Sequence, residues 1–191
     1  IVSVPTTTSG TFVYNLLSVQ DSATHSCSQV QTGTATIVIN PLASATISGT
    51  TTMCQGGTSP FITFTGSGGT APYTFTYNIN GGASQTVATT TGNSVTVSVP
   101  TSTSGTFTYN LTGVQDTSST TCLQTLTLSV SVVVRPLPSA TISGTTSICQ
   151  DGTSPAITFT GSGGTAPYSY NWSSGGTNSS INNFFSSRFI F

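Results

Sequence analysis

The chain has 191 residues, contains neither Lys nor Glu, and carries five charged side chains: Asp21, Asp116, Arg135, Asp151 and Arg188. Two arginines cannot neutralise a run of phosphates or hold an anionic lipid surface, which excludes nucleic acid and charged membranes as partners. No apolar run approaches the roughly 20 residues of a membrane helix, so we expect no membrane insertion.

The composition favours a folded all-β protein. Thr, Ser and Gly dominate, and the apolar residues are largely Val, Ile, Phe and Tyr, which are common in strands. A disordered chain is normally more hydrophilic and more highly charged. Residues 1–4, IVSV, form a strand-like pattern with no signal peptide, so we expect an internal segment of a longer protein.

Alternation of apolar and polar residues recurs along the chain and is interrupted by Gly and Pro turn signals. The clearest interruption is GSGGTAP at residues 66–72. The predicted strands, in chain order, are 12–16, 45–48, 61–65, 73–79, 85–88, 95–99, 107–111 and 126–132. Because no segment of ten residues shows helical periodicity, the predicted fold class is all-β.

Comparison of the chain with itself reveals a repeat at a constant offset of 95 residues. TSPFITFTGSGGTAPY at 58–73 returns as TSPAITFTGSGGTAPY at 153–168, and FVYNL at 12–16 returns as FTYNL at 107–111. PLASATISG, which begins at Pro41, likewise returns as PLPSATISG. The repeat therefore defines the units of the chain.

We predict three units: residues 1–40 are the C-terminal part of a preceding repeat, 41–135 a complete repeat, and 136–191 the N-terminal part of a following repeat. About seven strands in about 95 residues is typical of an immunoglobulin-like sandwich, so tandem sandwiches of this type are expected. The third unit diverges after Tyr168, and FFSSRFIF at 184–191 has no counterpart in the complete repeat.

The junctions between units are short and contain proline, as in NPL at 40–42 and RPLP at 135–138. Proline fixes φ, so neighbouring units are expected to stack as a semi-rigid rod. Residues 136–191 and 1–40 would together make one repeat. Copies of the chain could therefore complete a domain head to tail by strand donation, and the competing interpretation is an arbitrarily cut array.

Each repeat contributes two cysteines, which suggests disulfides in an extracellular protein. The favoured pairing is Cys54 with Cys122 inside the complete repeat, with Cys27 and Cys149 paired to residues outside this sequence. Such a loop closure contributes about 4 kcal/mol in the entropic treatment. The rival scheme, Cys27–Cys54 and Cys122–Cys149, would link neighbouring domains. One His and no closely spaced Cys pair disfavour a zinc site, and no cofactor is expected.

No residue pattern points to catalysis. His25 is replaced by Thr120 in the next unit, which indicates a solvated loop residue. Asp21 and Asp116 recur in the sequence VQD and are interpreted as turn-forming residues that accept backbone N–H groups, in preference to single calcium ligands.

The remaining recurrent features also have structural interpretations. The Gly-rich segments at 66–69 and 161–164 lack the Lys and helix of a phosphate-binding loop. Tyr14 and Tyr109 are expected in the core, with a tyrosine corner as one arrangement.

The repeat PLPSATISGTTSICQDGTSPAITFTGSGGTAPY, together with GTFTYNLTGVQD and the Cys that follows it, resembles the tandem Ig-like and PKD-like repeats of large secreted surface proteins of Bacteroidota. The similarity covers residues 1 to about 170, and residues 167–183 resemble a related repeat of gliding-motility adhesins. The resemblance implies export to the cell surface, adhesion or spacer roles, and no enzymatic activity. It also implies candidate O-glycosylation at Ser22 in Asp21-Ser22-Ala23, whereas the equivalent DTS at 116–118 departs from that pattern.

The sequence thus favours a non-enzymatic structural or adhesive segment of an extracellular surface protein, acting as a stalk or spacer. The alternative is a subunit of a self-assembling extracellular filament. Expected partners are neighbouring repeats, copies of the same chain, surface glycans or other cells. The many Thr-x-Thr steps raise an ice- or glycan-binding role, but regular ranks of Thr on one flat sheet are not evident.

Overall fold

The computed structural model describes residues 1–22, 24–25, 27–118, 120–144, 146–173 and 185–186. These residues form strands and loops and no helix, so the predicted all-β class is confirmed. The strands are β1 (Gly10–Gln20), β2 (Ser28–Ile39), β3 (Ser44–Ser48), β4 (Thr51–Cys54), β5 (Phe61–Ser67), β6 (Thr74–Ile79), β7 (Gln85–Ala88), β8 (Ser94–Ser98), β9 (Gly105–Gln115), β10 (Leu123–Arg135), β11 (Ser139–Ser143), β12 (Thr158–Ser162), β13 (Ser169–Tyr170) and β14 (Phe185–Ser186).

The chain forms two compact units. One comprises residues 1–50, 60–99 and 107–132, and the other comprises residues 51–59, 100–106 and 133–191. This division does not follow the repeat boundaries predicted from the sequence, which stay a prediction.

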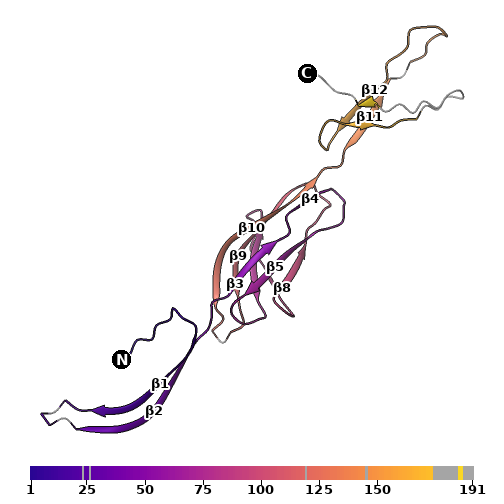
Figure 1. Cartoon of the computed structure of the whole chain (residues 1–191). Coiled ribbons are helices and arrows are strands. Elements are labelled where there is room, and N and C mark those ends of the chain that lie inside the picture. The colour runs from indigo at the N-terminus through magenta and orange to yellow at the C-terminus, as the bar shows by residue number, and fades with distance from the viewer. Residues whose placement is uncertain (23, 26, 119, 145, 174–184, 187–191) are drawn as a thin grey trace. The chain divides into compact units, whose positions relative to one another are not determined.

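Strands β3 to β10 form two sheets, an antiparallel three-stranded sheet in the order β3-β5-β8 and a five-stranded sheet in the order β4-β10-β9-β6-β7, in which β6 is antiparallel to both β7 and β9 (Figure 1). Side chains of the two sheets meet in a shared core, where the ring of Phe64 on β5 contacts Phe75 and Tyr77 on β6 at centroid distances of 5.7 and 5.1 Å. Apolar and polar residues alternate along β5, so that one side of the strand faces the core. Ile62 and Phe64 are buried on that side, and Thr63 and Thr65 point away from the core.

The loop after β5 is held against the second sheet. Gly69 has φ of +58°, and a Cβ atom on it would lie 2.4 Å from a carboxylate oxygen of Asp116. Only glycine allows this approach in this conformation. The hydroxyl of Tyr73 donates a hydrogen bond to the Gly68 carbonyl and closes the loop.

The third part of the chain repeats the local geometry of the complete repeat. In the β11–β12 pair, Ser139 faces Ser162 and Ile142 faces Phe159, which reproduces the pairing of Ser44 with Ser67 and of Ile47 with Phe64 in β3–β5 at an offset of 95 residues. Three rings also recur: Phe159 contacts Tyr170 and Trp172 at 5.6 and 5.0 Å. Trp172 thus occupies the place of Tyr77, although the sequence around it has diverged.

Strands β1 and β2 form an antiparallel hairpin with a bulge between Leu16 and Ser18. Strand β1 lies 95 residues before β9 with the same bounds, and β2 begins 95 residues before β10, which extends one residue further, to Arg135. Strands β9 and β10 are neighbours in the five-stranded sheet. Residues 184–191 were predicted to lack a counterpart in the complete repeat. Among them, only the two residues of β14 lie within the described residues.

Candidate functional site

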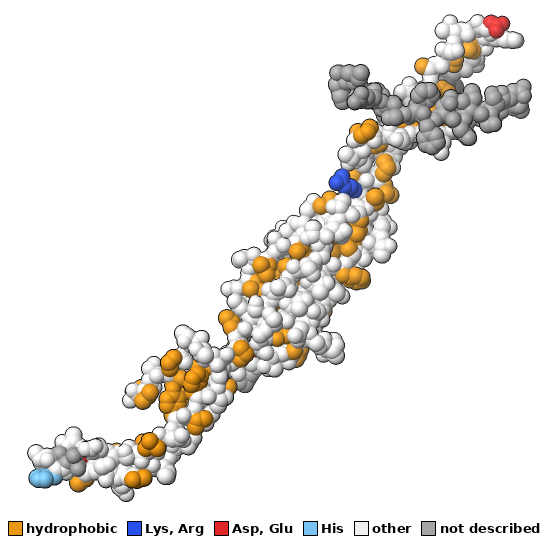
Figure 2. Space-filling model, viewed as in Figure 1, with side chains coloured by type: hydrophobic (Ala, Val, Ile, Leu, Met, Phe, Trp, Pro, Cys, Tyr) orange, Lys and Arg blue, Asp and Glu red, His pale blue; other side chains and the backbone are white. Residues whose placement is uncertain are grey.

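The most conspicuous surface of the described residues is one side of the β1–β2 hairpin. Phe12 faces Ile37 and Tyr14 faces Ala35 across the hairpin, so their side chains share one side of the two-stranded sheet. We call this side the hairpin face; it comprises Phe12, Tyr14, Leu16, Val19, Ile37 and Ile39. Figure 2 shows hydrophobic side chains gathered over the hairpin region, where charged side chains are rare.

The equivalent residues of β9 and β10 are buried. Leu16 is 53 % exposed and Tyr14 is 37 % exposed, whereas their counterparts Leu111 and Tyr109 are 0 % exposed. The counterpart of Ile37, Val132, is buried as well. The hairpin face therefore has the composition of a core surface, and Tyr14 does not lie in a core as the sequence predicted.

A second apolar surface lies on the third part of the chain. We call it the front face; it comprises Ala140, Ile157, Phe159, Tyr170 and Trp172. Ala140 and Ile157 are exposed and the three rings are half-buried, whereas the counterparts Ala45, Ile62, Phe64, Phe75 and Tyr77 are all buried. The front face therefore also has the composition of a core surface.

The buried carboxylate of the complete repeat belongs to Asp116, which is 2 % exposed. Its Oδ2 accepts the backbone N–H of Thr70 at 3.0 Å, and its Oδ1 accepts the Ser118 hydroxyl at 2.9 Å and the Cys122 N–H at 3.0 Å. Asp116 thus links the loop after β5 to the turn between β9 and β10. The predicted turn-forming role is confirmed.

Two opposing effects act on the pKa of Asp116. Burial raises it, and hydrogen bonds from the Ser118 hydroxyl and from the backbone of Thr70, Ser118 and Cys122 lower it. The hydrogen bonds outweigh burial, so the pKa lies below its ordinary value and the group is a carboxylate at neutral pH. An ionised acceptor surrounded by donors is suited to fixing loops rather than to moving protons.

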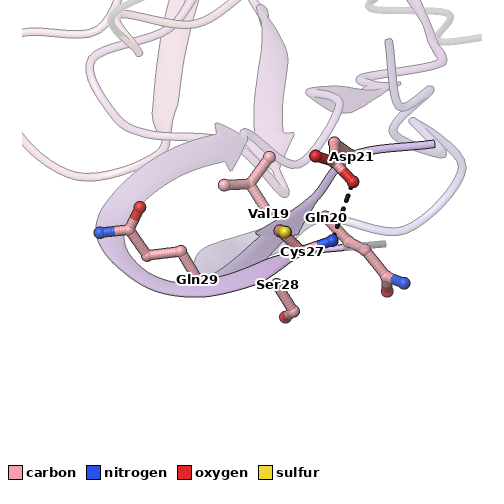
Figure 3. A pocket seen from close by; sticks show the side chains of 6 residues that line it. All are labelled: Val19, Gln20, Asp21, Cys27, Ser28 and Gln29. Carbon is pink, nitrogen blue, oxygen red and sulfur yellow. Dashed lines mark hydrogen bonds between the residues drawn. The ribbon is translucent and has the colours of Figure 1, made fainter. Parts of the chain in front are cut away.

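The hairpin turn contains an open surface depression of about 490 Å³, lined by Val19, Gln20, Asp21, Cys27, Ser28 and Gln29 (Figure 3). Asp21 accepts the N–H of Cys27 at 2.9 Å, which repeats the Asp116–Cys122 contact. Ser22, the candidate O-glycosylation site, is exposed in the same turn, as is His25. Within the described residues, no three or more His, Cys, Asp or Glu side chains gather as a metal site.

The predicted Cys54–Cys122 disulfide is not present in the structure. Cys54 ends β4 beside Arg135, because the N–H of Gln55 donates to the Arg135 carbonyl at 2.8 Å. Cys122 precedes Leu123 at the other end of β10. All four thiols are free, and the pairing of Cys27 and Cys149 outside this sequence stays a prediction.

The tyrosine corner is not where the sequence placed it. Tyr109 lies fully in the core, 6.2 Å from the ring of Tyr77, but among the described residues its hydroxyl has no hydrogen-bond partner. Burial raises the pKa of Tyr109, with a further increase from Tyr77. The tyrosine hydroxyl that bonds to a nearby loop backbone is that of Tyr73, and Tyr168 repeats its bond to Gly163.

The two apolar faces were not singled out by sequence reasoning. The signal that could have found them is the 95-residue offset, because it assigns each residue of the partial repeats to a buried or exposed position in the complete one.

In the part of the chain that the structure describes, no helix is long and apolar enough to cross a membrane. Comparisons of the chain with protein-family models, with curated proteins and with solved structures found no match in any of the three.

Proposed function

We propose that the chain is a non-enzymatic structural or adhesive segment of an extracellular surface protein, built from tandem immunoglobulin-like sandwich repeats that act as a semi-rigid stalk or spacer. The observation that carries the proposal is the recurrence, at an offset of 95 residues, of strand bounds, strand register and the three-ring cluster. Repeating one module that has its own core makes a protein longer without adding a new kind of site.

The surface chemistry supports the same proposal. Outward positions of β5 and β6 carry Thr63, Thr65, Thr74 and Thr76, and the only charged side chains between Gly66 and Gly144 are Asp116 and Arg135. Hydroxyl groups keep such a surface wetted without a strong electrostatic field. The buried Asp116, with its four loop contacts, serves to hold the module together.

Surface labelling tests the proposal. Antibodies raised against the chain should label intact cells that produce it, and brief protease treatment of those cells should remove the signal. A cytoplasmic protein of the same cells, probed in parallel, should stay unlabelled. Labelling that appears only after the cells are permeabilised would contradict the extracellular role.

A second candidate function is a filament subunit joined head to tail. The observation that favours it is that the hairpin face and the front face carry apolar side chains whose counterparts in the complete repeat are buried.

A further inference from the structure

We propose that Asn80 is a site of spontaneous covalent modification, in which its side chain closes a succinimide ring with the nitrogen of Gly81, and that Asn78 protects it. The site lies in the turn after β6, inside the complete repeat. The proposal goes beyond the proposed function and does not depend on it, because it concerns the chemistry of a single turn.

The geometry of this turn requires the Asn-Gly sequence. The N–H of Gly82 donates to the Ile79 carbonyl at 2.9 Å, so Asn80 and Gly81 are the two central residues of a β-turn. Their φ values are +52° and +73°, which is the conformation of a type I′ hairpin turn. Asn and Gly adopt such angles more readily than other residues. This is the only Asn-Gly step in the chain.

An Asn-Gly step is also chemically labile. The Gly81 nitrogen loses its proton and attacks Cγ of Asn80, and ammonia leaves as the succinimide ring closes. Glycine permits the attack because no side chain shields its nitrogen. Water then opens the ring at either carbonyl, which gives aspartate or isoaspartate at position 80. The net reaction consumes one water molecule and releases one ammonia, so the only co-reactant is water.

The turn supplies what the electrophile needs. Asn80 is exposed, so water reaches it. Its Oδ1 accepts the backbone N–H of Thr108, on β9, at 2.7 Å. During the attack this oxygen gains negative charge, and a hydrogen-bond donor that is already in place stabilises that charge, as in an oxyanion hole.

Asn78 acts on the nucleophile. The N–H of Gly81 donates to Oδ1 of Asn78 at 3.0 Å, so the proton that has to leave the nitrogen is held in a hydrogen bond. The Nδ2 of Asn110 donates to the same oxygen at 2.8 Å and fixes the Asn78 side chain. Asn78 is half-buried on β6, which lies between β7 and β9 in the sheet. The protecting group therefore belongs to the sheet and not to the loop.

The backbone holds the turn in the same arrangement. The N–H of Asn80 donates to the Thr108 carbonyl at 2.8 Å, so Asn80 is fixed to β9 by its main chain as well as by its side chain. Attack by Gly81 requires the turn to open first, because the Gly81–Asn78 hydrogen bond has to break. The modification rate should therefore follow the population of the open turn.

Modification would act on β7. This strand is at one edge of the five-stranded sheet and pairs there with β6 alone. Isoaspartate lengthens the main chain of the turn that joins the two strands, and this disturbs the register that places Tyr77 opposite Gln85. Protection of Asn80 thus preserves the edge of the sheet.

Incubation in water labelled with oxygen-18 measures the modification, because each conversion leaves one labelled oxygen at position 80. Chymotrypsin cleaves after Tyr77 and Phe107, and fragmentation of that peptide in the mass spectrometer locates the label. The folded full chain should convert at least about tenfold more slowly than the same chain unfolded in urea, because attack needs an open turn. Equal rates in the two states, or label at other asparagines only, would overturn the proposal.

Three substitutions separate protection by Asn78 from general stability. N78A removes the acceptor of the Gly81 N–H and should raise the rate in the folded chain about tenfold, the factor that corresponds to one hydrogen bond. N78D keeps an acceptor oxygen at this place, and an ionised acceptor holds an N–H more strongly, so its rate should not exceed that of the wild type. N110A leaves the Gly81 contact intact, so its rate should stay within about threefold of the wild type.

Urea midpoints of the same variants show whether a changed rate comes from global unfolding. N78A and N110A both lose the contact between these two side chains, yet a large rate increase is expected for N78A alone. An unchanged rate in N78A, or equal increases in N78A and N110A, would show that Asn78 does not protect the turn. Cell-surface labelling would be unaffected by either result.

Discussion

The β9–β10 pair and the β1–β2 hairpin are equivalent parts of the repeat in two environments. Strands β1 and β9 have the same bounds at an offset of 95 residues, yet Leu111 is buried and Leu16 is half exposed. The difference teaches that the strand pair forms from its own alternation and turn, whereas its burial depends on a second sheet. Local structure and tertiary packing are thus separable in this protein, and each can be perturbed alone.

The largest effect is expected from a charge at the position where the two pairs differ most. L111D should lower the free energy of unfolding by about 4 kcal/mol or more, because it removes a buried side chain and buries a carboxylate. L16D, at the exposed counterpart, should change it by less than about 1 kcal/mol. Urea unfolding followed by far-UV circular dichroism gives both values, and equal losses would contradict the comparison.

Replacing Asp116 should lower the free energy of unfolding more than replacing its counterpart Asp21, just as replacing Leu111 should lower it more than replacing Leu16. D116N should lower the free energy of unfolding by about 2–3 kcal/mol, because an ionised acceptor of several buried donors is lost. D21N, at the exposed counterpart, should cost less than about 0.5 kcal/mol. Urea titration of both variants at neutral pH checks this, and a larger loss for D21N would reverse the assignment.

The lowered pKa of Asp116 predicts how stability changes with pH. The folded-state pKa lies below the unfolded value of about 3.9, so the stabilisation is present above that value and is lost as pH falls through the folded pKa. The urea midpoint of the wild-type chain should therefore fall between neutral pH and strong acid more steeply than that of D116N. Parallel slopes for the two proteins would show that Asp116 does not carry the acid sensitivity.

The smallest effect is expected in the loop that Asp116 holds. G69A should cost about 2 kcal/mol, because φ is +58° and the new Cβ would meet the Asp116 carboxylate. G92A is the matched control: φ is +68° and no atom lies within 4 Å, so only the backbone cost of about 1 kcal/mol remains. Identical urea midpoints for the two variants would mean that the close approach of Gly69 to Asp116 adds nothing to the loss of stability.

Much of the fold could be predicted from the sequence, because alternation over several residues is a strong signal. The predicted strands at 45–48, 85–88 and 107–111 correspond to β3, β7 and β9. Strand β4, TTMC, was missed because four residues with one large apolar side chain give no periodicity. Its existence depends on pairing with β10, which the local sequence does not encode.

The cysteine pairing could not be predicted from the sequence for a related reason. Equal cysteine spacing in each repeat says that the pattern recurs, but it does not say at which end of a strand each cysteine lies. The position of Cys54 depends on β4, the strand that was missed. By contrast, the turn role of Asp116 was predicted correctly because the short segment that contains Asp116, Ser118 and Cys122 encodes it locally.

The central claim is that β9 is closed into a sandwich core whereas its counterpart β1 is not, and hydrogen exchange followed by mass spectrometry tests it most directly. Tyr109 and Leu111 are 0 % exposed, whereas Tyr14 and Leu16 are 37 % and 53 % exposed. The amides of β9 should therefore exchange much more slowly than those of β1, because β9 packs against a second sheet. Equal exchange rates for the two strands would contradict the claim.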